Sequence, residues 1–269
     1  MALKSLSFSL LMIPPINLPQ GKKIFFISDF HLGAPNAAQS VIRERRIIAW
    51  LNEVSKDAAA IFLMGDIFDF WFEYKHVIPK GFVRLQGKLA QITDSGIPVY
   101  LFTGNHDMWM FGYFNEELKI PLFRKPEELI VNGKKFLIGH GDGLGPHDHM
   151  YKFLKKIFAN KFFQWLFRIT HPDVGISIAN FWSRNSRAKQ GKNEESFLGE
   201  SEWLWTYCKE VEQKQHHDYY IFGHRHLPLD LQVGNNSRYI NLGEWITHFT
   251  YASYDGQNLE LKKFDKEVW

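Results

Sequence analysis

Short, continuously apolar runs recur along the chain from residue 23 onwards, and they are rich in the β-branched and aromatic residues that favour strands. Runs of this length without polar alternation are typical of strands that are buried on both faces of a sheet. They comprise residues 23–28, 59–64, 98–103, 135–139, 219–222, 238–242 and 247–253. We therefore expect a sheet-based protein with a well-buried core.

Two amphipathic stretches alternate with the first three of these runs. Residues 40–56 place Ile47, Trp50 and Leu51 on one broad apolar face, as expected for a helix that packs on a sheet. Residues 82–94 have a similar pattern and are followed by a glycine and a proline, which end helices. This alternation of strand and helix predicts parallel strand pairing and a layered α/β architecture.

The later part of the chain has a different pattern, in which turn signals separate neighbouring strands. Asn132-Gly133 and Asp255-Gly256 are both strong signals for a two-residue hairpin turn. Because hairpins join antiparallel strands, we expect either one mixed sheet or two packed sheets with helices outside.

Composition narrows the class of protein further. The chain has 269 residues, of which 45% are hydrophobic and 23% charged, which excludes a disordered chain, a coiled coil and a fibre. The single cysteine, Cys208, excludes an intramolecular disulfide framework and a cysteine zinc site. The net charge of +3 is too small to indicate nucleic-acid binding. We expect residues 1–22 to be a tail or an extra edge segment.

Residues 147–192 stand apart from the rest of the sequence. This stretch carries a net charge of +7 and nine aromatic residues, and we interpret it as a helical insertion that is interrupted near residues 170–172. Tyr151, Leu154, Phe158, Phe162, Trp165 and Ile169 recur at three- and four-residue spacing, as one stripe of a helix. Apolar width combined with Lys155, Lys156 and Lys161 favours contact with a lipid or an anionic membrane surface. The alternative is a helix pair that packs on the main domain with its lysines in solvent.

Five short polar motifs follow strand-like runs, where α/β proteins build their sites. They are Ser28-Asp29-Phe30-His31, Gly65-Asp66, Gly104-Asn105-His106-Asp107, Gly139-His140-Gly141-Asp142 and Gly223-His224-Arg225-His226. In an extended segment, the i, i+2 spacing of Asp29 and His31, and of His224 and His226, puts both members of each pair on one face. The glycines allow the backbone to turn sharply out of each strand.

These motifs contribute more metal-binding groups than one catalytic zinc ion uses. Two aspartates, one asparagine and four histidines make seven candidate ligands, whereas catalytic zinc sites use three protein ligands. Seven ligands suit two metal ions that share a bridging carboxylate. Mixed oxygen and nitrogen ligands without thiolate favour Mn²⁺, Fe or Zn²⁺ over Ca²⁺.

The remaining histidines receive different interpretations. We expect a surface or structural role for His76, His171, His216, His217 and His248. His147 and His149 lie just after a motif and are candidates for contact with the site.

The ordered motifs resemble the calcineurin-like metallophosphoesterase superfamily from about residue 23 to residue 269. Within it, the chain is most similar to the bacterial UDP-2,3-diacylglucosamine diphosphatases of lipid A synthesis. The supporting residues are the run from Gly65 to Trp71, the insertion between His140 and His224, and Arg184-Asn185-Ser186 inside that insertion. The resemblance implies a single domain, residues 23–269, with an α/β/β/α four-layer sandwich and a helical lid at about residues 147–200.

The resemblance also implies a role for each motif residue. Asp29, His31 and His226 would hold one metal ion, Asn105, His140 and His224 the other, and Asp66 would bridge them. His106 would stabilise developing charge or protonate the leaving group, and Asp107 beside it is a candidate to fix its tautomer. The positions that match substrate contacts are Trp71, Tyr151, Arg184, Asn185, Arg187 and Lys189.

The implied activity is hydrolysis of the UDP-2,3-diacylglucosamine pyrophosphate to lipid X and UMP, with two divalent ions, foremost Mn²⁺. The protein would act in the cytoplasm as a peripheral protein on the inner face of the inner membrane, without an obligate protein partner. One residue departs from the best-known branch, which has arginine where this chain has His106. Two alternatives stay open: a phosphoesterase for a soluble nucleotide, phosphoprotein or nucleic acid, and a non-catalytic scaffold on the same fold.

Overall fold

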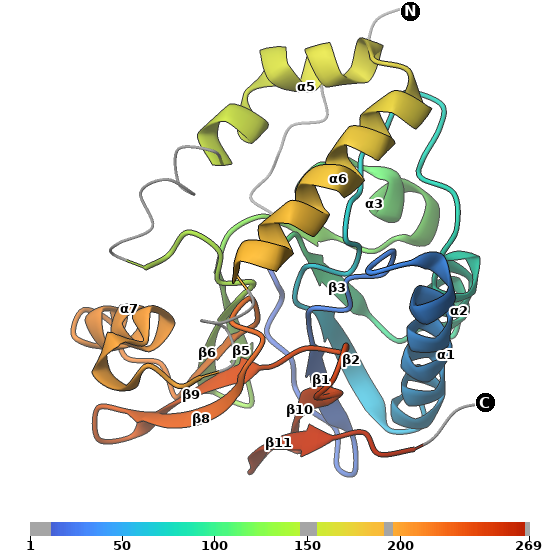
Figure 1. Ribbon diagram of the computed structural model, residues 1–269. Coiled ribbons are helices and arrows are strands. Elements are labelled where there is room, and N and C mark those ends of the chain that lie inside the picture. The colour runs from blue at the N-terminus through green and yellow to red at the C-terminus, as the bar shows by residue number, and fades with distance from the viewer. Residues whose placement is uncertain (1–11, 146–154, 191–195, 267–269) are drawn as a thin grey trace, which may run out of the picture.

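The computed structural model describes residues 12–145, 155–190 and 196–266, and these form four layers. Two β-sheets lie face to face in the middle, and helices cover their outer faces (Figure 1). Helices α1 (Ala37–Val54) and α2 (Val83–Asp94) pack on one sheet, and α7 (Trp203–Glu212) packs on the other. The predicted α/β/β/α architecture is therefore confirmed.

The first sheet has six strands in the order β11-β10-β1-β2-β3-β4. Its parallel part comprises β1 (Lys23–Ile27), β2 (Ala58–Leu63), β3 (Val99–Phe102) and β4 (Leu122–Phe123). Strand β10 (Thr250–Tyr254) joins β1 in the antiparallel sense, and β11 (Leu259–Lys263) follows it as a hairpin. Helix α3 (Tyr113–Leu118) lies between β3 and β4 in the chain.

The second sheet has five strands in the order β5-β6-β7-β9-β8. Its parallel centre comprises β6 (Lys134–Gly139), β7 (Tyr219–Phe222) and β9 (Ser237–Leu242). Antiparallel strands flank it, namely β5 (Glu127–Val131) and β8 (Pro228–Val233). Ile16 from the N-terminal segment forms an isolated bridge with Val131 of β5.

Aromatic side chains join the two sheets into one core. Phe26 of β1 stacks on Phe62 of β2 with ring centroids 5.1 Å apart, and on Phe136 of the opposite sheet at 6.2 Å. All three side chains are fully buried. Because apolar burial is the main source of folding free energy, this layer fixes how the two sheets face one another, and hence where their strand ends meet.

Two turn regions differ in part from the pattern in the sequence. Asn132 and Gly133 form the predicted two-residue turn, with φ values of 48° and 82°. Asp255 instead begins a four-residue loop, because its carboxylate accepts hydrogen bonds from the backbone N–H groups of residues 257 and 258. Strand β10 begins at Thr250 and not at residue 247, because the Glu244 carboxylate binds the N–H groups of residues 247 and 248 and holds them in a loop.

Helices α5 (Lys161–Ile169) and α6 (Pro172–Gln190), inserted between β6 and α7, lie over one end of the sandwich (Figure 1). We call α5 and α6 the lid helices. Residues 155–159, just before α5, are also helical. The predicted interruption near residues 170–172 is present. The predicted single stripe is wrong, because the Asn160 side chain accepts a hydrogen bond from the N–H of Phe162 at 2.8 Å and starts a new helix there. The short 3₁₀ turn Gly199–Ser201 then leads into α7. Within the described residues, no helix combines the length and apolar character needed to cross a bilayer.

Candidate metal centre and active site

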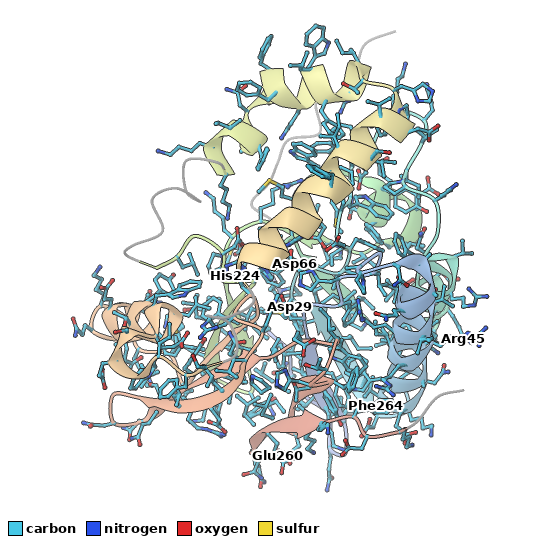
Figure 2. All side chains as sticks on the ribbon, viewed as in Figure 1. Asp29, Arg45, Asp66, His224, Glu260 and Phe264 are labelled. Carbon is cyan, nitrogen blue, oxygen red and sulfur yellow. The ribbon has the colours of Figure 1, made fainter. Side chains whose placement is uncertain are left out.

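The predicted metal ligands follow the carboxyl ends of five parallel strands from the two sheets. Strands β1, β2 and β3 lead to Asp29, Asp66 and Asn105, while β6 and β7 lead to His140 and His224. Since the two sheets face one another, these ends meet. Figure 2 shows the labelled Asp29, Asp66 and His224 close together beneath one end of α6.

The backbone is strained at most of these positions. Five of the seven predicted ligands have a left-handed φ, a conformation that non-glycine residues rarely adopt. They are Asp29 (57°), His31 (44°), Asp66 (52°), His224 (65°) and His226 (57°). Strain of this kind persists only where surrounding contacts enforce it, and it concentrates at functional sites.

At two motif positions, glycine is needed because a side chain would clash with neighbouring atoms, and not because of the backbone angle. A Cβ atom on Gly104 would collide with the Asp66 carboxylate, and one on Gly223 would collide with the side chains of Ser28 and Asp29. Neither glycine has a positive φ. The sequence interpretation, in which these glycines allow a sharp turn, is therefore replaced by a requirement for close approach.

One half of the cluster consists of Asp29, His31 and His226. The Nε2 atoms of His31 and His226 lie 3.0 Å apart, and Asp29 Oδ1 lies 3.2 Å from His226 Nε2 and 3.7 Å from His31 Nε2. Asp29 and His31 are fully buried. Three ligand atoms thus converge on one point.

The other half consists of Asn105, His140 and His224. Asn105 Oδ1 lies 3.3 Å from His140 Nε2, and the rings of His140 and His224 have centroids 5.0 Å apart. His140 Nδ1 lies 2.9 Å from the backbone oxygen of Met64, so Nδ1 carries the proton and donates it there. That hydrogen bond leaves the Nε2 lone pair available to a metal ion.

Asp66 lies between the two halves. Its Oδ2 atom is 3.4 Å from His140 Nε2 and 3.8 Å from His31 Nε2, so the same oxygen faces both groups. Its Oδ1 atom accepts a hydrogen bond from the backbone N–H of His106 at 2.8 Å. This is the arrangement that a bridging carboxylate needs.

The buried polar atoms fit divalent cations. Asp29 Oδ1 is buried without a hydrogen-bond partner among the described residues, and leaving such an atom unpaired is costly. Burial acts to raise the pKa of Asp66, but the charges of His140 and His106 hold that pKa well below its usual range, so the carboxylate is ionised. Burial also acts against the charged form of His140, yet the Asp66 carboxylate raises the pKa of His140 to about 10. The ionised carboxylates therefore attract positive charge, which bound metal ions would supply.

His106 lies at the edge of this cluster and is oriented by Asp69. Its Nδ1 atom is 3.0 Å from the Asp69 backbone oxygen and 3.6 Å from Asp69 Oδ1. A hydrogen bond from Nδ1 leaves Nε2 to face a substrate. Burial lowers the pKa of His106 to about 4.

The contacts of Asp107 differ from the expected role in fixing the tautomer of His106. Its carboxylate accepts hydrogen bonds from the backbone N–H groups of Gly104 and Ile67, each at 2.7 Å. Asp107 therefore holds two ligand-bearing loops together, and Asp69 takes the position beside His106. Asp69 could have been found from sequence, because it follows Asp66 by three residues in the same motif.

Other buried charges support the ligand loops and were missed from the sequence. The Arg43 guanidinium donates to the backbone oxygens of Phe30 and His31 at 3.0 and 2.9 Å. Arg225, between two ligand histidines, forms a buried ion pair with Glu202 at 2.7 Å. Sequence patterns carried no signal for Arg43, because nothing local relates a helix residue to a loop that precedes it.

The structure places the predicted substrate contacts in three ways. Trp71 is fully buried, stacks on Phe68 at 4.3 Å and has no surface open to a substrate. Tyr151 lies outside the described residues, as do His147 and His149. The other four lie in the C-terminal part of α6, namely Arg184, Asn185, Arg187 and Lys189. Their side chains are outside the described part of the structure, so their contacts with substrate stay a prediction.

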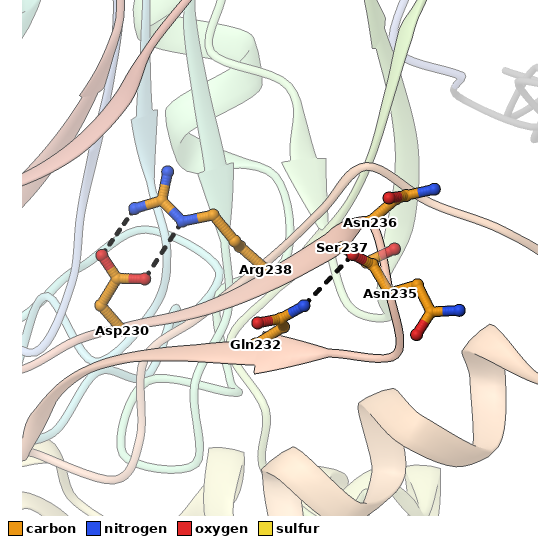
Figure 3. Close-up of a pocket in the computed structure, with 6 residues that line it drawn as sticks. All are labelled: Asp230, Gln232, Asn235, Asn236, Ser237 and Arg238. Atoms are coloured by element: carbon orange, nitrogen blue, oxygen red, sulfur yellow. Dashed lines mark hydrogen bonds and ion pairs between the residues drawn. The ribbon is translucent and has the colours of Figure 1, made fainter.

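Two pockets lie apart from this cluster. One, of about 390 Å³, is lined by the β8–β9 hairpin, where Arg238 pairs with Asp230 at 2.6 Å (Figure 3). The other, of about 200 Å³, is lined by residues of α1 and the loop after β9. Neither contains a predicted ligand.

The sequence profile described as "Calcineurin-like phosphoesterase" matches residues 22–228. The chain belongs to the calcineurin-like phosphoesterase family. It is therefore a metal-dependent hydrolase, and its clustered histidines and aspartates indicate a site for two metal ions.

Relatives within the family cover nearly the whole chain. A protein from Porphyromonas gingivalis, named UDP-2,3-diacylglucosamine hydrolase, is 36% identical over 90% of this chain and 98% of its own. One of the same name from Actinobacillus succinogenes is 26% identical over 83% of this chain and 92% of its own. Among solved structures, Vacuolar Protein Sorting 29 from Cryptosporidium parvum covers 92% of this chain and 100% of its own, with a TM-score of 0.43 and 12% identity.

Asp66→Asn should remove the charge that allows two dications to lie close together. We expect loss of bound metal and a fall in phosphoesterase activity of at least about 100-fold, equivalent to a few kcal/mol of transition-state stabilisation. Elemental analysis and turnover of a phosphodiester measure both effects. Asp94→Asn, the same change at an exposed helix end, should alter neither. Near-normal turnover with two bound metal ions would show that Asp66 does not bridge.

His106→Ala should keep both metal ions, because His106 is not among the predicted ligands. Its kcat should fall by roughly 10²- to 10⁴-fold, the range for loss of a proton-transferring group. His106→Arg, which restores positive charge, should retain more activity than His106→Ala if the role is charge stabilisation. The exposed His76→Ala serves as the control. Loss of a metal ion in His106→Ala would instead make His106 a ligand.

Proposed function

We propose that this protein hydrolyses the pyrophosphate bond of UDP-2,3-diacylglucosamine to give lipid X and UMP, a step of lipid A biosynthesis. The observation that carries the proposal is the end-to-end match to a protein named for that activity, at 36% identity over 98% of the relative. The donor cluster agrees with it, because phosphoryl displacement is the chemistry that a pair of metal ions stabilises.

In this proposal the protein's own residues hold the metal ions and orient the group that faces the phosphate. Two divalent cations, when bound, would polarise the reacting phosphate and activate water. Asp29, His31 and His226 would hold one cation, Asn105, His140 and His224 the other, and Asp66 both. His106, held by Asp69, would face the phosphate. The negative charge of the bound phosphate favours the protonated ring, whose Nε2–H would stabilise the charge that develops on the phosphate oxygens. The leaving phosphate is weakly basic, so its departure requires charge stabilisation more than a full proton.

We propose Mn²⁺ as the native ion, with Fe and Zn²⁺ as alternatives. The predicted ligands are carboxylate and amide oxygens and imidazole nitrogens, without a thiolate. Carboxylate suits Mn²⁺, whereas imidazole also suits Fe and Zn²⁺. Hence the donor set alone favours a transition metal over Ca²⁺ or Mg²⁺.

The lid helices present an apolar surface that suits a lipid substrate. On α5, the exposed fractions of Phe162, Trp165 and Ile169 are 61%, 54% and 61%. On α6, Ile178 and Phe181 are 57% and 67% exposed. A soluble nucleotide substrate gives no reason for such a surface, and large exposed apolar patches mark interaction sites.

Exposed cations accompany this surface, namely Lys156, Lys161 and Arg168. Aromatic residues with neighbouring lysines are typical of helices that lie at an anionic membrane surface. We therefore place the protein at the cytoplasmic face of the inner membrane as a peripheral protein, with the lid helices toward the lipid.

Two alternatives make different predictions. A phosphoesterase for soluble substrates would use the same donor cluster without the apolar lid surface. A scaffold on the same fold would have no use for an imidazole that Asp69 orients beside seven predicted ligands. The lid surface and His106 therefore favour the lipid hydrolase.

Detergent-dispersed UDP-2,3-diacylglucosamine should be turned over in the presence of Mn²⁺, with release of UMP. Chelation should abolish turnover, and readdition of Mn²⁺ should restore it. A panel of nucleotides and phosphopeptides, assayed in parallel by phosphate release, should be hydrolysed far more slowly. Rapid hydrolysis of one panel member without turnover of the lipid would establish the soluble-substrate alternative.

Replacement of Phe162, Trp165 and Ile169 together by Ser should raise KM for the diacylated substrate strongly, since each buried methylene contributes about 0.8 kcal/mol. Phe158 is not included, because its backbone oxygen and ring contact Trp109. Hydrolysis of a small phosphodiester should change little. Replacement of the exposed Ile42 and Val83 by Ser, remote from the lid helices in sequence, is the control. An unchanged KM in a folded, metal-loaded triple variant would contradict the lipid-contact role.

A further inference from the structure

The lid helices are attached to the two loops that carry Asp69 and His106. Phe167 of α5 packs against Phe70 and Phe72, with ring centroids 5.8 and 4.7 Å apart. It also packs against Trp109 at 4.7 Å. Trp109 Nε1 donates a hydrogen bond to the backbone oxygen of Phe158 at 2.8 Å. Phe70 and Phe72 follow Asp69 by one and three positions, and Trp109 follows His106 by three.

One hydrogen bond continues this attachment into the active site. Ser183 of α6 donates from Oγ to Asp69 Oδ2 at 3.0 Å, although the two residues are 114 positions apart in the chain. The same Oγ lies 3.4 Å from His106 Nδ1. The other carboxylate oxygen, Asp69 Oδ1, lies 3.6 Å from His106 Nδ1 and 3.8 Å from His31 Nδ1.

We propose that Ser183 is a positioning residue, through which the seating of α6 on the active site fixes Asp69, whose backbone oxygen and carboxylate both lie beside His106 Nδ1, and hence orients the His106 ring. The inference rests on the role proposed above for His106. It adds a connection between the lid, which meets the substrate, and the group that acts on the phosphate.

The geometry gives Ser183 this role for a simple reason. A carboxylate has two oxygens on one rigid plane, so a donor that holds one oxygen fixes the direction of the other. Asp69 is 5% exposed, and water therefore has little access to replace the serine hydroxyl. A hydroxyl must donate to a carboxylate, since an ionised carboxylate only accepts. With Oδ2 held, Oδ1 stays 3.6 Å from His106 Nδ1, beside the Asp69 backbone oxygen to which that Nδ1 donates at 3.0 Å.

The matching control lies on the same helix. Ser177 is exposed, and its Oγ donates to the backbone oxygen of Asp173 at 2.6 Å within α6. Ser183→Ala and Ser177→Ala therefore remove the same hydroxyl from the same helix, and only Ser183→Ala removes a contact with the active site.

Steady-state hydrolysis of bis(4-nitrophenyl) phosphate and of UDP-2,3-diacylglucosamine should separate the two variants. We expect Ser183→Ala to lower kcat about 10-fold on both substrates, with KM and metal content unchanged, as for loss of an outer hydrogen bond that orients a catalytic group. Ser183→Thr, which keeps the hydroxyl, should restore most of the rate. Ser177→Ala should match the parent protein.

A double-mutant cycle tests whether Ser183 acts through His106. In the His106→Ala background, Ser183→Ala should cause no further loss of kcat, because the group that it positions is absent. An additional 10-fold loss in that background, or an unchanged kcat in Ser183→Ala alone, would overturn the proposal.

NMR of the His106 ring tests the role of Ser183 without any enzymatic turnover, and therefore independently of which substrate the protein hydrolyses. The ¹⁵N resonances of the His106 ring, assigned by their loss in His106→Ala, should shift in Ser183→Ala and not in Ser177→Ala. If the lipid is not hydrolysed by the parent protein, the proposed function fails, while the ring resonances and the small diester still decide the role of Ser183. Identical His106 resonances in Ser183→Ala and the parent would contradict it.

Discussion

The Asp66 carboxylate is buried where the carboxyl ends of the two sheets meet, and the active site is arranged around it. One of its oxygens lies within 4 Å of imidazole nitrogens from both halves of the cluster, and the other accepts the backbone N–H of His106. A buried, ionised carboxylate is costly unless positive charge compensates it. Metal binding in this protein therefore balances an electrostatic cost that the fold itself creates.

Holding this arrangement requires backbone conformations that are unfavourable locally. Five of the predicted ligands adopt left-handed angles, each at a cost of order 1–3 kcal/mol. The compensation comes from buried groups nearby: Arg43 binds the loop of Asp29 and His31, and the Arg225–Glu202 pair holds the loop of His224 and His226. These cations bind the backbone and side chains that support the loops, and the loops that carry the predicted ligands depend on them.

The lid helices are attached to this rigid centre on one side and exposed on the other. Their outer surface is apolar and exposed, whereas their inner surface contacts the site through Ser183 and Phe167. Lys155, which precedes α5, adds an ion pair in which its Nζ lies 2.5 Å from Asp142 Oδ2. The two surfaces of these helices therefore differ, because one is open to solvent and the other is bonded to the site. The metal centre of a calcineurin-like phosphoesterase is combined here with a helical insertion whose exposed surface suits the lipid-linked substrate proposed above.

Much of the fold and the metal centre could be predicted from the sequence because the signals are local. An apolar run followed at once by a polar residue marks a strand end, and parallel strands bring those ends together. By itself, the sequence determined the strand pattern and the candidate ligands from Asp29 to His226. Their role as ligands remains a prediction.

Only the tertiary structure decided which groups pair across long separations. It placed Asp69, and not Asp107, beside His106, and it brought Ser183 to Asp69 from 114 residues away. It also distinguished the Phe167 side of the lid, which packs on Trp109, from the exposed Trp165 side. Helical periodicity defines a stripe of side chains but not what covers it, because the covering surface comes from distant parts of the chain.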